Sequence, residues 1–254
     1  PEKAVGASEN PFRFGPIDFG RFGTLSKAEL AELAARGYAQ GGLARAALHS
    51  SRVPHSDDAW FNISRLAIDA TDPMALGGAE IEGRRQAWKA AEFIAAHVPG
   101  CGDGRLRAFA TQVGVRETRR VEGDHVLTAA ELLEPVQFAD AIAAGAYPID
   151  IHPAKGGSLH YVPMGDDHAY QIPYRSLIPS TLDNALGVGR GISASHEALA
   201  AIRVMTISMA VGHAAGIAAA MAARSAREGM GAQVRAVAVP ALREALLREG
   251  AVLA

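Results

Sequence analysis

The sequence predicts an α/β chain in which helices and strands are mixed along its length. Three patterns carry this prediction. Apolar residues recur at helical spacing from Leu25 to Ser50, and no Lys, Arg, Asp or Glu occurs from Val204 to Ala223. Between these segments, Trp60 to Ala70 alternates apolar and polar residues, which is typical of a strand. The 254 residues, 49% of them hydrophobic, suffice for one large domain or two small ones, and we place a boundary at residue 150.

The first hundred residues predict an irregular start followed by a helix, a strand and a second helix. Residues 1–23 are rich in Gly, Pro and Phe and leave room for one short strand. Ser26 is placed to cap the first helix at its N-terminus. The second helix is predicted from Gly77 to His97, where Pro99 and Gly100 stop it. Its charged residues indicate a solvated face.

Residues 106–152 predict a bent strand, two short helices and another short strand. The segment from Leu106 to Val121 reads as one bent strand or as two strands interrupted at Gly114. The two helices lie between Leu127 and Ala144, are separated at Pro135, and open on a capping box at Thr128. The next strand is predicted from Tyr147 to His152.

The last hundred residues begin with a polar loop from Pro153 to Gly165 and end with an amphipathic helix from Val239 to Glu249. The loop contains Lys155 followed by two Gly residues, but it lacks the flanking pattern of a phosphate-binding P-loop. A role in cradling phosphate is therefore not favoured.

The stretch between these two segments is the most informative about function. A short apolar strand from Asn184 to Val188 is predicted to enter a turn of Gly189, Arg190 and Gly191, where missing Cβ atoms let the backbone approach a bound group. A polar loop follows the turn. The long uncharged helix comes next and is predicted to be buried nearly all round.

The N-terminal end of this uncharged helix is a candidate binding site. Its first backbone N–H groups have no partner within the helix, and the helix dipole leaves partial positive charge there. Arg203, at the junction, adds a permanent charge. A flavin, a phosphate or a carboxylate would suit such a site. His196 precedes the helix, in the predicted loop. It could donate or accept a proton, form a hydrogen bond to a flavin, or have its hydrogen bonds satisfied by the loop backbone.

The same stretch resembles the C-terminal flavin-binding segment of the FAD-dependent oxidoreductase family related to the flavoprotein subunits of fumarate reductase and succinate dehydrogenase. The resemblance rests on G-R-G-I-S-A-S-H-E-A-L-A-A-I-R-V-M from Gly189 and G-H-A-A-G-I-A-A-A from Gly212. Other strings agree with it over roughly residues 58 to 225: W-F-N-I-S-R from Trp60, E-G-R-R-Q-A-W from Glu82, V-G-V-R-E-T-R-R from Val113, Y-P-I-D-I-H from Tyr147 and Y-Q-I-P-Y-R-S-L-I-P from Tyr170.

The resemblance implies FAD as cofactor and hydride transfer between a small organic substrate and the flavin. It implies a partial flavoprotein fold, with residues 1–150 as a substrate or cap-like domain and residues 151–254 as the segment that contacts FAD. The cofactor-binding residues would be Gly189, Arg190, Gly191, Ser193, Arg203, Val204 and Met205, and the catalytic residues His196, Arg203, Tyr174 and Arg175.

The expected roles of these catalytic residues are distinct. Arg175 and Arg203 would hold an anionic or carbonyl-bearing substrate or stabilise reduced flavin, while Tyr174 orients the substrate. Arg175 has a purely structural alternative, which is an ion pair with Asp166, Asp167 or Asp183. The R-E-T-R-R string from Arg116 has two equally weighted interpretations, which are a polar wall near the site and an edge strand with alternating charges.

One departure from the family pattern is large. The sequence contains no G-x-G-x-x-G fingerprint of the dinucleotide-binding turn, and the glycines from Gly187 to Gly191 have the wrong spacing for it. Because the chain also begins at Pro1, we expect a C-terminal part of a longer protein or one subunit of a split enzyme. A partner chain or missing segment would carry the dinucleotide-binding fold. The alternative is a non-catalytic subunit that stabilises or regulates a partner chain.

Composition argues against several other classes. The net charge of −2 gives no electrostatic footprint for nucleic acid or anionic membranes. One Cys, Cys101, excludes an intrachain disulfide framework and a Cys-rich metal site, and no His pair has the helical spacing of metal ligands. The uncharged helix is long enough to cross a bilayer, but its Ala content and His213 argue against insertion. We therefore expect no metal, no membrane span and a cytoplasmic location.

Overall fold

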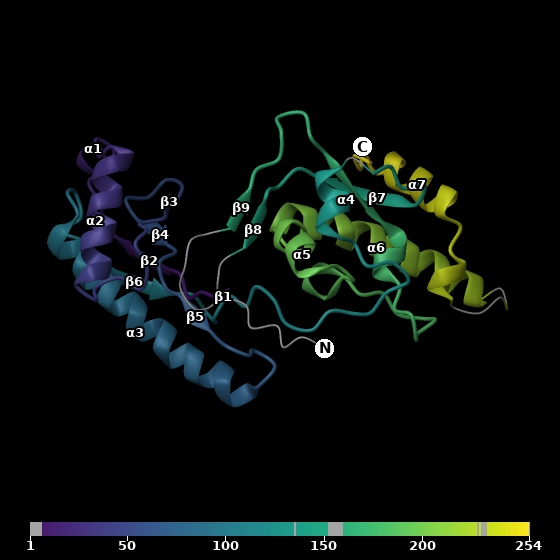
Figure 1. Ribbon diagram of the computed structural model, residues 1–254, viewed down its shortest axis with the longest axis horizontal. Helices are drawn as coiled ribbons and strands as arrows, with labels where there is room; N and C mark the ends of the chain where they lie inside the picture. Colours follow the sequence, from purple (N-terminus) through teal and green to yellow (C-terminus); the bar gives the residue numbers. More distant parts are fainter. Residues whose placement is uncertain (1–6, 135, 152–159, 228, 230–232, 254) are drawn as a thin grey trace. The chain divides into compact units, whose positions relative to one another are not determined.

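The chain forms two compact units in the computed structural model, the first extending through Thr118 and the second beginning at Arg119. The residues that the structure describes are 7–134, 136–151, 160–227, 229 and 233–253. Helices and strands occur in both units, which confirms the predicted mixed α/β class (Figure 1). The predicted division at residue 150, into a substrate or cap-like domain and an FAD-contacting segment, stays a prediction.

A four-stranded antiparallel sheet forms the centre of the first unit. Phe12, Phe14 and Phe61 are fully buried on it, and the rings of Phe12 and Phe61 stack with their centroids 5.7 Å apart. These rings supply much of the apolar area that holds the unit together. In spatial order the strands are β3 (Ser50–Arg52), β4 (Ala59–Phe61), β2 (Phe12–Gly15) and β6 (Arg105–Phe109).

The single strand predicted from Trp60 to Ala70 is wrong. β4 ends at Phe61, and the next strand, β5 (Leu66–Ala67), pairs instead with β1 (Ala7–Ser8) in a separate antiparallel ladder. Ser64, between them, accounts for the break, because its hydroxyl bonds both the N–H and the carbonyl of Asn10.

The helices of the first unit begin at the residues that the capping signals indicate. α1 (Phe19–Phe22) is short, whereas α2 (Lys27–Ala39) opens on Ser26 in a full capping box with Glu29. The predicted helix ran to Ser50, but α2 ends much earlier because Gly41 has a φ of +72°, outside the right-handed helical region.

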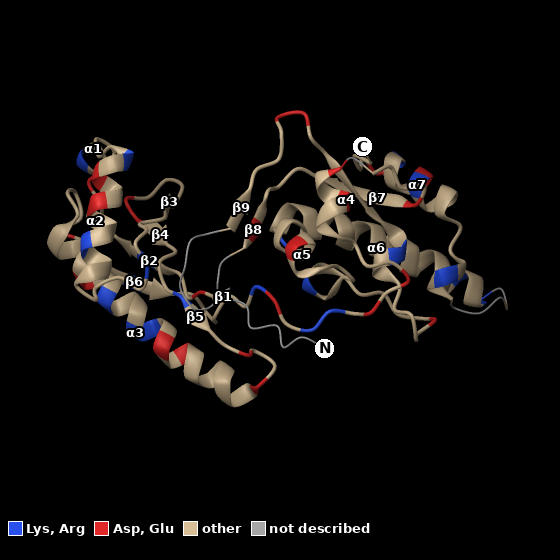
Figure 2. Cartoon of the chain, viewed as in Figure 1, with Lys and Arg blue, Asp and Glu red and all other residues tan. Residues whose placement is uncertain are grey.

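The longest helix of the first unit, α3 (Pro73–His97), begins four residues before its predicted start. Asp72 caps it by accepting a hydrogen bond from the Met74 N–H at 2.9 Å, and Pro73 occupies the first helical position, where its fixed φ is favourable. Ala87, Ala90 and Ile94 are buried in the same core as the phenylalanines of the sheet. The other face of α3 carries acidic and basic side chains (Figure 2).

The second unit combines two antiparallel strand pairs with several helices. β7 (Ala141–Gly145) pairs with β10 (Tyr170–Pro173), and β8 (Ile149–Ile151) pairs with β9 (His160–Val162). α6 (Met205–Arg227) packs against both β7 and α7 (Val239–Arg248), as Figure 1 shows. The helical elements are α4 (Ala129–Leu133), the 3-10 turns η1 (Tyr174–Leu177), η2 (Gly189–Gly191) and η3 (Val234–Ala236), and the helices α5 (His196–Ile202), α6 (Met205–Arg227) and α7 (Val239–Arg248).

Two predictions for the second unit need correction. The capping box at Thr128 is confirmed at the start of α4, but the second predicted helix before Ala144 is the strand β7. Alanine has the highest intrinsic helix propensity, but propensity is a weak determinant of structure, and backbone pairing with β10 overrides it here. The strand predicted from Asn184 to Val188 is also wrong, because that segment is irregular and enters η2 directly. Residues 153–159 of the predicted loop lie outside the described residues, and residues 160–162 of it form the strand β9 instead.

The uncharged helix differs from its prediction in two ways. It begins as a separate helix, α6, after α5 has ended at Ile202, and only one of its faces is buried. Met205 and Met209 on the opposite face are 81% and 72% exposed. Among the described residues, α6 is the one helix that has the length and composition to cross a membrane, which is weak evidence for a span. The buried face consists of Ile207, Val211, Ala214, Ala215, Ala218 and Ala222.

Candidate functional site

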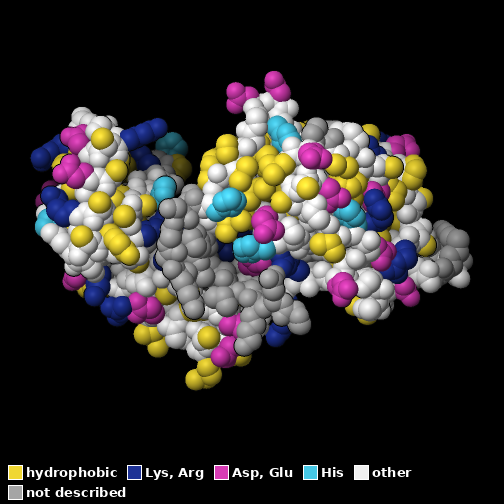
Figure 3. All heavy atoms as spheres, viewed as in Figure 1, with side chains coloured by type: hydrophobic (Ala, Val, Ile, Leu, Met, Phe, Trp, Pro, Cys, Tyr) yellow, Lys and Arg dark blue, Asp and Glu magenta, His cyan; other side chains and the backbone are white. Residues whose placement is uncertain are grey.

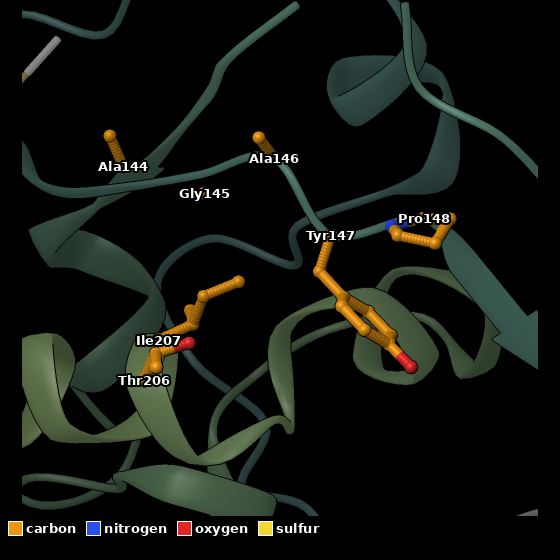
Figure 4. A pocket seen from close by; sticks show the side chains of 7 residues that line it. All are labelled: Ala144, Gly145, Ala146, Tyr147, Pro148, Thr206 and Ile207. Carbon is orange, nitrogen blue, oxygen red and sulfur yellow. The ribbon is translucent and has the colours of Figure 1, made fainter. Parts of the chain in front are cut away.

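A cavity of about 450 Å³ lies at the N-terminal end of α6. One wall is the end of β7 and its connection to β8, and the other wall is the first turn of α6 (Figure 4). Figure 4 shows Thr206 and Ile207 directed from the helix toward that connection, with the Tyr147 ring at one side. The lining residues carry no formal charge: Ala144, Gly145, Ala146, Tyr147, Pro148, Thr206 and Ile207.

Close packing at Gly145 brings the two walls together. A Cβ atom on Gly145 would lie 2.6 Å from the Tyr170 ring and 2.7 Å from Cδ1 of Ile207. The Tyr170 ring is fully buried, and its hydroxyl donates to the carbonyl oxygens of Tyr147 at 3.2 Å and Ala201 at 3.4 Å. Burial raises the pKa of this phenol well above its ordinary value, so it stays protonated and keeps its donor.

The helix end beside the cavity has positive electrostatic character. The first N–H groups of a helix lack partners within it, and the first turn of α6 contains no acidic residue to neutralise them. Arg203 caps the preceding helix α5, and its Nη2 donates to the carbonyl oxygen of Asp150 in β8 at 3.0 Å. This bond fixes the helix junction, with Val204 and Met205, against the strand that follows the cavity wall.

The predicted Gly-rich turn is held by the segment around residues 121–123. Gly189 has a φ of +58°, which glycine adopts readily. The carbonyl of Gly191 accepts a bond from the Val121 N–H at 2.9 Å, and the buried Ser193 hydroxyl accepts one from the Gly123 N–H at 3.1 Å. η2 also packs against α6, so the turn and the helix belong to one structural region.

His196 lies in a different place from its prediction. It is the first residue of α5 rather than part of a loop, because Ser195 caps that helix by accepting from the Ala198 N–H at 3.2 Å. The His196 side chain is half-buried at the N-terminal end of α5.

Tyr174 is part of the core. Its side chain is 1% exposed, and its hydroxyl donates to the Val234 carbonyl at 2.8 Å. Burial raises the pKa of Tyr174 to about 12. The sequence predicted that Tyr174 orients a substrate, whereas in the structure its hydroxyl bonds a backbone carbonyl in η3.

Arg175 pairs with Asp140, which is none of the three aspartates considered from the sequence. Its Nε donates to Oδ2 at 2.9 Å and its Nη2 to Oδ1 at 3.2 Å, while half of the guanidinium side chain stays exposed. Burial raises the pKa of the Asp140 carboxyl, but the hydrogen bonds from Arg175 outweigh burial and hold the pKa below its ordinary value. The pair therefore keeps both charges at neutral pH.

Comparison with known families settles the broad identity of the chain. A family model described as FAD dependent oxidoreductase matches residues 13–246. The chain belongs to the FAD-dependent oxidoreductase family. FAD is the family's cofactor, and the match extends on both sides of the strings that the sequence resemblance covered. No curated protein and no solved structure matches the chain.

The cavity fits part of the cofactor of an FAD-dependent oxidoreductase. Its uncharged walls and the Tyr147 ring suit a flat aromatic ring system, and the open end of α6 suits the carbonyl edge of that ring. Figure 3 shows hydrophobic side chains gathered in the part of the second unit where β8 and β9 lie. Among the described residues, no three His, Cys, Asp or Glu side chains gather as metal ligands.

None of the residues predicted from the sequence as site residues lines this cavity, although three of them directly precede one of its walls. Arg203, Val204 and Met205 were predicted at the helix junction, next to Thr206 and Ile207. The opposite wall, which contains Gly145, was not assigned a role. Its only signal was the family string that begins at Tyr147.

Proposed function

We propose that the cavity at the start of α6 holds the isoalloxazine end of FAD in an enzyme that transfers hydride between a small organic substrate and the flavin. The observation that supports this most strongly is an uncharged cavity that meets a helix end with partial positive charge and no acidic residue. When bound, FAD supplies the N5 position that accepts or donates the hydride. The kinship with fumarate reductase and succinate dehydrogenase flavoproteins is part of the same proposal, supported by the sequence strings.

The residues of this chain have separate proposed roles. Arg203, fixed by Asp150, contributes a permanent positive charge beside the helix end. Arg175, oriented by Asp140, presents its exposed edge to an anionic or carbonyl-bearing substrate. His196 exchanges a proton with the substrate. Tyr174 is buried in the core and has a positioning role through the hydrogen bond from its hydroxyl to the Val234 carbonyl.

We also propose that a partner chain or a further segment carries the dinucleotide-binding fold. The sequence lacks G-x-G-x-x-G, so no residues are assigned to the ADP half of FAD. The exposed face of α6 supports this part of the proposal. Met205 and Met209 are largely exposed, and α6 contains no Lys, Arg, Asp or Glu before Arg224. An exposed apolar face of this kind is typical of a surface that binds another protein segment. At Gly212 and Gly216 an added Cβ would meet nothing within 4 Å.

Titration of the chain with FAD, FMN and riboflavin tests the cofactor proposal. We expect all three to bind with similar dissociation constants, on the order of 0.1 mM, because only the shared isoalloxazine would contact this chain. The change in flavin fluorescence on binding gives the constants. ADP should not compete.

The outcomes of this titration separate the two parts of the proposal. If none of the flavins binds, the cavity is not a flavin site. If FAD binds far more tightly than riboflavin and ADP competes, this chain itself holds the ADP half, and the partner is unnecessary. A complex that binds FAD but is never bleached by any substrate would favour the alternative of a non-catalytic subunit.

Gly216→Lys tests the exposed face of α6. Lysine is the better helix former by roughly 0.5–1 kcal/mol, so the chain should be as stable as the wild type or slightly more so in urea unfolding. Recovery of a FAD-containing complex with a second chain that bears G-x-G-x-x-G should fall at least about tenfold, because a charge would be buried in the interface. Gly102→Lys, at another open position, is the control. Equal recovery from both variants would show that this face does not bind the partner.

A further inference from the structure

The side of α3 that faces away from the core carries a row of large apolar side chains. Met74, Ile81 and Trp88 are 83%, 75% and 54% exposed. They are seven residues apart, so they lie in one line that is about 21 Å long. Gly83 and Ala90, about half a turn away around the helix, are buried. The exposed side of a surface helix normally carries polar residues, so this apolar row is a candidate binding surface.

The apolar row is symmetric about Ile81. Met74 lies seven residues before Ile81, and Trp88 lies seven residues after it. If two copies of α3 pack antiparallel about a twofold axis at Ile81, residues equally far before and after this position lie level with one another. Met74 of each copy then meets Trp88 of the other, and Ile81 meets its own counterpart. A second copy of the chain therefore covers the whole row at once.

The small residues beside the row fit the same pairing. Arg84 of one copy lies level with Gly78 of the other, because each is three residues from Ile81. Arg85 lies level with Gly77 in the same way. An added Cβ at either glycine would meet nothing within 4 Å. The open backbone at the two glycines leaves room for the long arginine side chains of the second copy.

The charges beside the row are complementary to those of a second copy. Glu80 and Arg84 lie on the same side of the row and form an ion pair of 2.5 Å within the helix. An antiparallel twofold pairing brings the same side of both helices together, so Arg84 of one copy lies within one turn of Glu80 of the other. The Arg84 side chain is 39% exposed and accessible to this second carboxylate. On the other side of the row, Arg85 neutralises Glu82 through two hydrogen bonds of 2.6 Å each.

We propose that the apolar row of α3 is the interface of a homodimer in which two copies of the chain pair their α3 helices antiparallel about Ile81. Burial of Met74, Ile81 and Trp88 from both copies drives the association, and the charges beside the row favour this register. The row consists of residues of the first unit, whereas the flavin cavity and the exposed face of α6 belong to the second unit. Neither proposal depends on the other.

Sedimentation velocity of the full chain at increasing concentration tests the dimer. We expect the mass to rise from the monomer value of 26.5 kDa to twice that value, with a dissociation constant on the order of 10 µM. Ile81→Glu should remain monomeric, because the twofold axis would bring two carboxylates together in apolar surroundings. Glutamate is a good helix former, so the urea midpoint should not fall. Leu247→Glu, at an exposed apolar position of α7, is the matched control and should dimerise as the wild type does.

An exchange of charges tests the register of the two helices. Met74→Lys and Trp88→Glu should each weaken the dimer at least about tenfold, because each would bury a charge without a partner. The variant that combines both changes should dimerise at least about tenfold more tightly than either single variant, because each new ammonium group would meet a new carboxylate of the second copy. The two positions are about 21 Å apart within one helix, so the rescue cannot arise within a single chain.

Three results would overturn the proposal: the wild-type chain stays monomeric at every concentration, Ile81→Glu dimerises as the Leu247→Glu control does, or the combined variant dimerises no better than the single variants. A monomeric chain whose Ile81→Glu variant fails to recover the second chain that bears G-x-G-x-x-G would also overturn it, and would assign the row to that partner. The flavin titration of the monomer is unaffected by any of these results, since it measures a cavity in the other unit.

Discussion

Replacing Thr206 by Glu is expected to weaken FAD binding at least about tenfold while the chain stays folded. Thr206 lines the cavity in the first turn of α6, where the wild-type sequence has no acidic residue. A carboxylate there would interact favourably with the helix end, by about 0.3–1 kcal/mol, and would help α6 to form. The same carboxylate would occupy the positive site and repel electron-rich oxygens of the ligand. Stability and binding should therefore change in opposite directions.

Fluorescence titration with FAD and urea unfolding of the same samples measure these two effects. Thr206→Gln is the matched control, because it has nearly the same size without the charge and should retain most of the affinity. Full FAD affinity in Thr206→Glu would show that the start of α6 is not where the flavin binds. A similar loss in both variants would indicate a steric effect rather than an electrostatic one.

Gly145→Val is expected to be the most destabilising change at this site. The new Cβ would lie within 3 Å of both the Tyr170 ring and Ile207, which are buried and cannot move freely. Overpacking of this kind costs about 1–3 kcal/mol, and here it would also push apart the two walls of the cavity. We expect a lower urea midpoint together with the loss of flavin binding.

Gly216→Ala provides the comparison for this loss of stability. It adds one methyl group at a helical glycine that has nothing within 4 Å of the new atom, so it should stabilise the chain by about 0.5–1 kcal/mol. A normal urea midpoint for Gly145→Val would show that β7 and α6 do not pack as closely as the structure indicates.

The features that could be predicted from the sequence are those with local causes. The N-cap at Ser26 and the capping box at Thr128 depend on side chains three residues apart, and both occur as expected. α7 starts at the predicted residue because its amphipathic pattern is also local. The end of α2 was missed although Gly41 stood in the sequence, because the apolar spacing continued past it.

The features that could not be predicted depend on distant partners. β7 reads as a helix by composition and becomes a strand only because β10 lies beside it. The single buried face of α6 depends on what covers it, which amino-acid composition does not report. Arg203 could be proposed as a site residue from its neighbours in sequence, whereas the role of Gly145 depends on Tyr170 and Ile207, which are far from it along the chain.

The buried hydroxyl of Tyr170 links a wall of the cavity to helix α5. A phenol has one proton to donate, yet two carbonyl oxygens lie within its reach, one on the connection at Tyr147 and one at the end of α5. A displacement that brings either carbonyl closer draws the proton away from the other. The Tyr170 hydroxyl therefore connects the backbone at Tyr147, which lines the cavity, to the C-terminal end of α5, so these two segments share one hydrogen-bond donor.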